Sequence, residues 1–194
     1  LCLVAVMFSF TAFGSRRGPT LLSANAVLLQ LFTLVSYVMD GFAYAGEAVG
    51  GHLVGAGSAA RFRRLVRSLF AWGLGLSLLF SAVFALGGSA LIALFTDAVA
   101  VRQAAEGYLL YAILLPPVAM SGFLLDGLFV GTTATSGMLL GFFALHGLLA
   151  PTLGNHGLWI AFLAYLALRG LVQGAQLPAI VRRSFAPSAA QTAH

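Results

Sequence analysis

The sequence predicts an all-α membrane protein, a six-helix transmembrane bundle whose first helix is truncated. Hydrophobic residues make up 60% of the 194 residues and charged residues only 8%, whereas a soluble domain carries about 25% charged residues. Apolar stretches also recur along the whole chain, whereas a secretory signal has a single stretch of about 7 to 15 residues. The lipid bilayer is therefore the expected solvent.

A helix needs about 20 residues to cross the hydrocarbon core of a bilayer, and we compare the lengths of the first three predicted helices with that number. Residues 1–13 span only about 20 Å, so we expect a helix that has lost its beginning, in a fragment of a longer protein. Residues 20–57 are too long for one perpendicular span and follow Pro19, at a first-turn position. Residues 65–86 form the third span, and Gly87-Gly88 predicts a break before a shorter piece ending at Phe95.

The last three predicted helices all contain or meet proline. Residues 108–132 carry Pro116-Pro117, for which we expect a kink or an unwound turn. Residues 137–153 are short and carry Pro151, and residues 157–177 are ended by Pro178. We accordingly divide the chain into a transmembrane lobe, residues 1–180, and a cytoplasmic, disordered tail, residues 181–194.

Arginines predict the orientation in the membrane. One group follows the second span and another follows the sixth, so an even number of crossings places both on one side, which the positive-inside rule makes cytoplasmic. The six residues of this side are Arg61, Arg63, Arg64, Arg67, Arg182 and Arg183, against Arg16, Arg17 and Arg102 on the other. The net charge of +5 does not indicate nucleic acid, because no basic stripe with interleaved aromatics is present.

Enzyme classes find no support in the motifs. The sequence contains no G-x-S-x-G elbow, no H-E-x-x-H and no P-loop. Cys2 is the single cysteine, so neither a disulfide framework nor a thiolate metal site is expected. We expect no enzyme activity, no metal site and no cofactor, and an ion gradient remains as the source of energy.

Three carboxylates lie within predicted spans, Asp40 and Glu47 on the second and Asp126 on the fourth. An aspartate at the membrane centre costs about 2.5 to 3.5 kcal/mol on translocon scales, so the presence of each of these carboxylates needs a structural or functional explanation. Asp97 and Glu106 lie in a connection where water solvates them, and we assign them no special role. The first three are the candidates for ion coupling.

A polar stripe follows one face of the second helix. Its members are spaced by three and four residues and fall within an arc of about 100°: Gln30, Thr33, Tyr37, Asp40, Tyr44 and Glu47. Such a stripe should face other helices or a water-filled cavity. Interhelical hydrogen bonding, worth about 0.6 kcal/mol per contact, is the alternative to a functional role, and we favour function for Asp40 because a mid-span carboxylate is expensive.

Asp126 and Arg169 are the remaining charged candidates. Asp126 precedes Gly127 and follows a proline-broken half-helix, a pattern that transporters use to place backbone dipoles around a bound ion. Arg169, a cavity-lining candidate on the sixth span, is expected to snorkel to the cytoplasmic interface. The alternative is an ion pair with Asp40 or Asp126.

Four stretches, in order, resemble one family. ANAVLLQLFTLVSYVMDGFAYAGEAVGGHLVGAG from Ala24 resembles the eighth helix of the MATE (multidrug and toxic compound extrusion) family, in its DinF-like branch. ALIALFTDAVAVRQAAEGYLLYAILLPP is similar to the connection between helices nine and ten. FLLDGLFVGTTAT is similar to the end of helix ten, and LGNHGLWIAFLAYLALRG to the start of helix twelve.

The resemblance implies one six-helix lobe, helices seven to twelve, of a twelve-helix fold around a central cavity. Asp126 matches a helix-ten carboxylate that helps to bind the coupling cation in some branches, and Asp40 and Glu47 match acidic positions of helix eight. The implied function is efflux of amphipathic or cationic small molecules in exchange for protons or sodium, in a bacterial inner membrane, with the missing amino-terminal lobe as partner. The alternatives are a transport-incompetent remnant, an assembly partner of another half-transporter, and a flippase for lipid-linked precursors.

Overall fold

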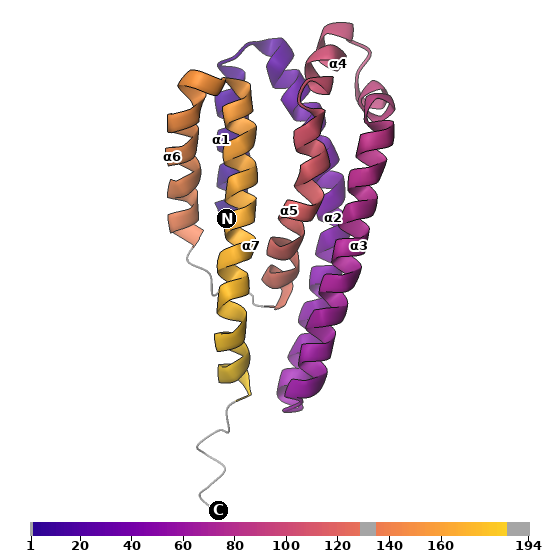
Figure 1. The fold of residues 1–194 in the computed structure, drawn as a ribbon, viewed down its shortest axis with the longest axis vertical. Coiled ribbons are helices and arrows are strands. Elements are labelled where there is room, and N and C mark those ends of the chain that lie inside the picture. The colour runs from indigo at the N-terminus through magenta and orange to yellow at the C-terminus, as the bar shows by residue number, and fades with distance from the viewer. Residues whose placement is uncertain (1, 129–134, 186–194) are drawn as a thin grey trace, which may run out of the picture.

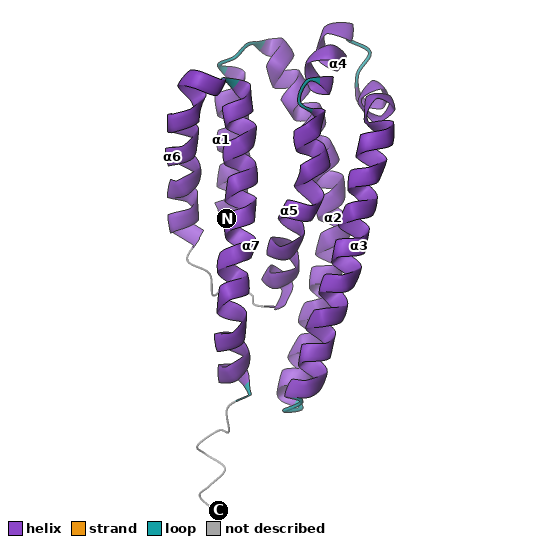
Figure 2. Ribbon diagram, viewed as in Figure 1, coloured by secondary structure: helices purple, strands orange, loops and turns teal. Residues whose placement is uncertain are grey.

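The computed structural model describes residues 2–128 and 135–185, and these fold into seven α-helices (Figures 1 and 2). In chain order they are α1 (Cys2–Ser15), α2 (Pro19–Gly55), α3 (Ala59–Phe95), α4 (Val99–Glu106), α5 (Leu109–Leu128), α6 (Thr135–Leu153) and α7 (Asn155–Ser184). Six of them lie at the six predicted spans. The short α4 occupies the connection in which no helix was expected.

Four helices within the described residues are long and apolar enough to cross a membrane: α2, α3, α5 and α7. The helices α2 and α3 have 37 residues each and are therefore about 55 Å long, well beyond the bilayer core of about 30 Å. The prediction of a helical membrane bundle is confirmed, and both long helices extend past the core.

The helix α5 lies inside the bundle and packs against α2, α3 and α7, while α6 packs on the outer side of α7 (Figure 1). The helix α5 continues through Pro116-Pro117, so of the two expected outcomes, a kink or an unwound turn, the unwound turn is wrong. Pro117 has no N–H for the carbonyl of Ile113, four residues earlier. The Ser81 hydroxyl on α3 donates to that carbonyl at 2.7 Å, so a neighbouring helix replaces the missing backbone donor.

The predicted break at Gly87-Gly88 is wrong, because α3 is continuous to Phe95. A Cβ at Gly88 would lie 2.6 Å from the Leu109 side chain. This glycine therefore allows close packing of α3 against the start of α5. The helix also begins earlier than expected, at Ala59, so the arginines at 61–67 lie on its first turns and not in a connection.

The predicted helix end at Pro178 is also wrong, since α7 runs through it to Ser184. Pro178 has no N–H, so only the carbonyl of Gly174, four residues earlier, loses its helical hydrogen-bond donor. Pro178 is exposed, so water can donate to that carbonyl instead. Residues 129–132 of the fourth predicted span, and residues 186–194 of the predicted tail, lie outside the described residues.

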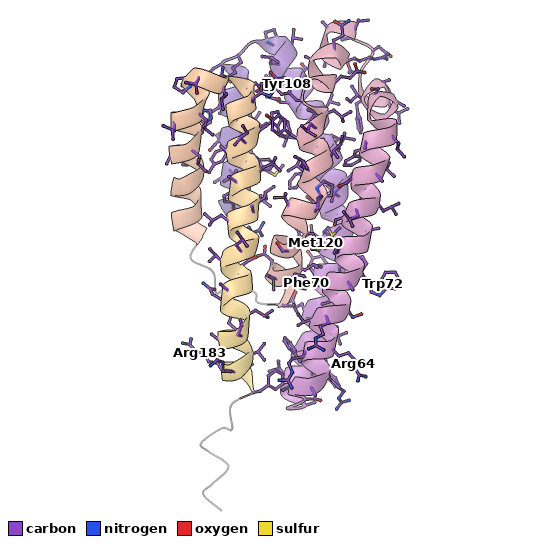
Figure 3. All side chains as sticks on the ribbon, in the orientation of Figure 1. Arg64, Phe70, Trp72, Tyr108, Met120 and Arg183 are labelled. Atoms are coloured by element: carbon purple, nitrogen blue, oxygen red, sulfur yellow. The ribbon has the colours of Figure 1, made fainter. Side chains whose placement is uncertain are left out.

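The two ends of the bundle differ in charge. Arg64 and Arg183 lie at one end and Tyr108 at the other (Figure 3), so the arginine groups at the start of α3 and at the end of α7 share one side, as predicted. At the opposite end Arg102 of α4 pairs with Asp97 at 3.0 Å and donates through Nε to the Thr96 carbonyl at 2.7 Å. Asp97 therefore forms a local ion pair in an exposed connection.

Candidate functional site

A cavity of about 330 Å³ lies between α2 and α5. All three candidate carboxylates line it, Asp40 and Glu47 from α2 and Asp126 from α5, together with Tyr44. Its other lining residues are Ala43, Phe123 and Gly127. Carboxylates 86 positions apart in the chain thus line one cavity, as expected for ionisable residues within membrane spans, which face the bundle interior or a cavity and not lipid.

Glycines bring the helices close enough for this arrangement. A Cβ at Gly127 would collide with the Ala43 carbonyl of α2, and a Cβ at Gly170 of α7 would collide with the Ser121 hydroxyl of α5. Small residues permit such close backbone approach between membrane helices. Each glycine directly follows a charged residue, Asp126 or Arg169, so the close contacts fix the positions of both charges.

Asp126 forms the centre of a polar cluster between α5 and α7. One carboxylate oxygen pairs with the Arg169 guanidinium and the other accepts a hydrogen bond from Gln173 Nε2. The Arg169 side chain is only 9% exposed, while that of Asp126 is 41% exposed. Asp126 therefore connects the buried cluster to the open cavity.

The expectation that Arg169 snorkels to the interface is wrong, because its guanidinium lies inside the bundle, paired with Asp126. It also lies 5.7 Å from the centre of the Phe123 ring, a cation–π distance. Burying an arginine is expensive unless it is paired, and these neighbours offset that cost. Arg169 lies behind the cavity wall and does not line it.

The polar stripe of α2 is divided by the structure. Asp40, Tyr44 and Glu47 line the cavity, whereas Gln30, Thr33 and Tyr37 lie nearer the start of the helix. Of these, Thr33 bonds back to the Leu29 carbonyl of its own helix at 2.9 Å. Tyr37 and Tyr44 are 71% and 70% exposed, so the stripe faces out of the described bundle and leaves the cavity open on that side.

Gln173 is a site residue that the sequence analysis missed. It is 5% exposed, it donates to Asp126, and its own Oε1 has no hydrogen-bond partner among the described residues. The available signal was its position four residues after Arg169, which places both side chains on the same face of α7. The described residues contain no group of three or more His, Cys, Asp or Glu side chains suited to holding a metal ion.

The described helices thus form a membrane bundle with a carboxylate-lined cavity and a buried ion pair beside it. Residues 1–153 match the MatE family, and the chain belongs to that family, in its DinF-like branch.

Two relatives support this assignment. DNA damage-inducible protein F of Escherichia coli (strain K12) is 40% identical over 189 residues, which cover 94% of this chain and 39% of the relative. Protein DETOXIFICATION 44, chloroplastic, of Arabidopsis thaliana is 28% identical over 182 residues, covering 89% of this chain and 35% of the relative. The chain thus spans less than two fifths of the length of either curated relative.

Proposed function

We propose that this chain forms one lobe of a secondary active antiporter, which exports amphipathic or cationic small molecules in exchange for protons or sodium ions. The observation that carries the proposal is the single cavity onto which Asp40, Glu47 and Asp126 all open. Membership of the MatE family supports transport as the activity. The ion, the substrate class and the inner-membrane location are parts of this proposal.

Asp126 is the proposed exchange site, because it contacts both the cavity and the buried cation. With no ion bound, Arg169 neutralises its charge. A proton or sodium ion arriving from the cavity competes with Arg169 for the same carboxylate, and Gln173 Oε1 offers a further oxygen beside it. Binding of the ion therefore weakens the link between α5 and α7.

Asp40 and Glu47 have the proposed role of attracting cations into the cavity. Their carboxylates lie on the α2 wall opposite Asp126, and a cavity lined by one sign of charge concentrates ions of the other sign. A cationic substrate and the coupling ion would then compete for the same negative surface. Such competition is what an antiporter needs, since only one of the two should be bound at a time.

The exposed face of α2 supports a second lobe as the partner. Tyr37 and Tyr44 project from the described bundle, and exposed tyrosines beside carboxylates are unsuited to a lipid-facing surface. A second lobe packed on this side would close the cavity and supply its other wall.

The experiment measures ethidium, a lipophilic cation, accumulating in cells that express the whole gene. Asp40→Asn, Glu47→Gln and Asp126→Asn are each expected to raise accumulation to the level of cells without the gene. Asp97→Asn and Glu106→Gln are the matched controls, because they remove carboxylates from the exposed connection, and they should leave efflux unchanged. Unchanged efflux in all three cavity variants would refute the assignment of the cavity to transport.

A further inference from the structure

A second cleft, with a different chemistry, lies at the arginine-rich end of the bundle between α3 and α7. It has a volume of about 380 Å³. Its charged lining consists of Arg63 and Arg67 from α3 and Arg182 from α7, and Val66, Leu177 and Val181 form much of its apolar lining. We refer to it as the arginine cleft.

The charges of the arginine cleft are not compensated by its own walls. The helices α3 and α7 contain no aspartate or glutamate, and within the described residues no carboxylate pairs with Arg63, Arg67 or Arg182. Arg63 and Arg67 are four residues apart, so they lie on one face of α3 and repel each other. An anion between the three guanidinium groups would relieve that repulsion. Glu47 lines an adjoining cavity, which shares Phe62 and Val181 with the arginine cleft.

The exposed side chains of α3 place the cleft at the membrane surface. Trp72 is 69% exposed and points away from the bundle (Figure 3), and the exposed apolar side chains beyond it include Leu86 and Leu94, at 91% and 84%. From Trp72 to Phe95 the helix spans about 35 Å, close to the thickness of a hydrocarbon core. Tryptophan marks the interface, so Arg67 and Arg63, about one and a half and two and a half turns further out, lie at headgroup level.

We propose that the arginine cleft binds one anionic phospholipid. The phosphodiester lies between the three guanidinium groups, which match phosphate oxygens in charge and geometry. The upper part of an acyl chain lies along Val66, Leu177 and Val181 and continues into the bilayer. Basic pockets between membrane helices on the cytoplasmic side recognise such headgroups. A free phosphate uses only the charged half of this lining, which is why a lipid is the better occupant.

The experiment is a lipid titration of the protein as expressed from its gene, purified in detergent, with native mass spectrometry as the readout. Phosphatidylglycerol is compared with phosphatidylcholine of the same acyl chains, and inorganic phosphate is added as a competitor. Phosphatidylglycerol is expected to remain bound where phosphatidylcholine dissociates. Displacement of the lipid by millimolar inorganic phosphate would show a simple anion site and overturn the proposal.

Two matched triple variants separate the cleft from general surface charge. Replacing Arg63, Arg67 and Arg182 by glutamine should weaken phosphatidylglycerol binding about 100-fold, at about fivefold for each arginine. Replacing Arg61, Arg64 and Arg183 by glutamine removes the same number of charges from the same end but from outside the cleft, and should have far less effect. Equal losses in the two variants would overturn the proposal.

A third variant keeps all the charges and fills the apolar half of the cleft. Val181→Trp leaves Arg63, Arg67 and Arg182 in place and should still reduce phosphatidylglycerol retention, because the acyl chain loses its surface. If the triple arginine variant fails to fold, Val181→Trp still tests the proposal. Undiminished retention in Val181→Trp would contradict a lipid seated between α3 and α7.

Discussion

Asp126 on α5 and Arg169 on α7 form an ion pair inside the bundle, and Gln173, one turn after Arg169, donates to the same carboxylate. The carboxylate also opens onto the cavity that Asp40 and Glu47 line. One side chain therefore links the packing of two helices to the cavity in which we propose that the coupling cation binds.

The ion pair predicts a compensating pair of substitutions. Asp126→Asn and Arg169→Gln should each lower the free energy of unfolding by about 1 to 3 kcal/mol, because each leaves a charge without its ion-pair partner in or beside the bundle interior. The double variant should be more stable than the sum of the two losses predicts. Unfolding in mixed detergent micelles measures all three, and strict additivity would contradict the coupling.

Ser81 predicts a second coupled pair. Ser81→Ala removes the donor to the Ile113 carbonyl and should cost about 1 kcal/mol. In a Pro117→Ala background the same change should cost less, because residue 117 then supplies a backbone N–H to that carbonyl.

A serine one turn earlier provides the control for this pair. Ser77 is buried, and its hydroxyl donates to the Leu74 carbonyl of its own helix at 2.9 Å, so Ser77→Ala should have little effect. An equal cost of Ser81→Ala with and without Pro117 would show that the hydroxyl does not compensate for the proline.

A buried amide cluster links α2 to α7 near the end of the bundle opposite the arginine cleft. Asn25 and Asn155 exchange hydrogen bonds of 2.8 and 3.0 Å, and Trp159 Nε1 also donates to Asn25 Oδ1 at 3.0 Å. Both asparagines are at most 4% exposed, so unpaired groups there cannot be hydrated.

The cluster predicts unequal costs for its two asparagines. Asn25→Leu leaves the Asn155 amide and the Trp159 N–H unpaired, at about 1 to 3 kcal/mol for each lost partner. Asn155→Leu spares the bond from Trp159 and should cost clearly less. Denaturant unfolding of the two variants checks this order, and a larger loss in Asn155→Leu would contradict it.

Hydropathy and spacing in the sequence predicted where the helices lie, but not the position of the Arg169 guanidinium. Hydropathy and length locate six apolar helices, and the spacing of Asp40, Tyr44 and Glu47 places them on the face that lines the cavity. The errors at Gly87-Gly88 and Pro178 arose because both residues were judged as helix breakers alone. Gly88 instead accommodates Leu109, a contact between helices that local pattern does not contain.

The pairing of Asp126 with Arg169 depends on how α5 crosses α7 and could not be derived from either helix alone. Snorkelling was the expectation for Arg169 because its distance from the helix end permits it. The close approach at Gly170 and Ser121 instead brings the guanidinium to a carboxylate 43 positions away. Gln173 was missed for the same reason, since its partner lies on another helix.

The orientation in the membrane gives a prediction of its own. In a Cys2→Ala background, Ala60→Cys lies at the arginine-rich end and Ala98→Cys at the opposite end, both exposed. A membrane-impermeant maleimide should label Ala98→Cys in cells with an intact inner membrane, and Ala60→Cys only after that membrane is opened. The reverse pattern would contradict a cytoplasmic location of the arginine groups.

The most direct test of the central claim is gradient-driven ethidium transport in proteoliposomes that contain the protein as expressed from its gene. An imposed proton or sodium gradient should drive transport by the unmodified protein and by Asp97→Asn, and Asp126→Asn should abolish the response to that gradient. Full gradient-driven transport by Asp126→Asn would contradict the account of Asp126 as the site of ion exchange.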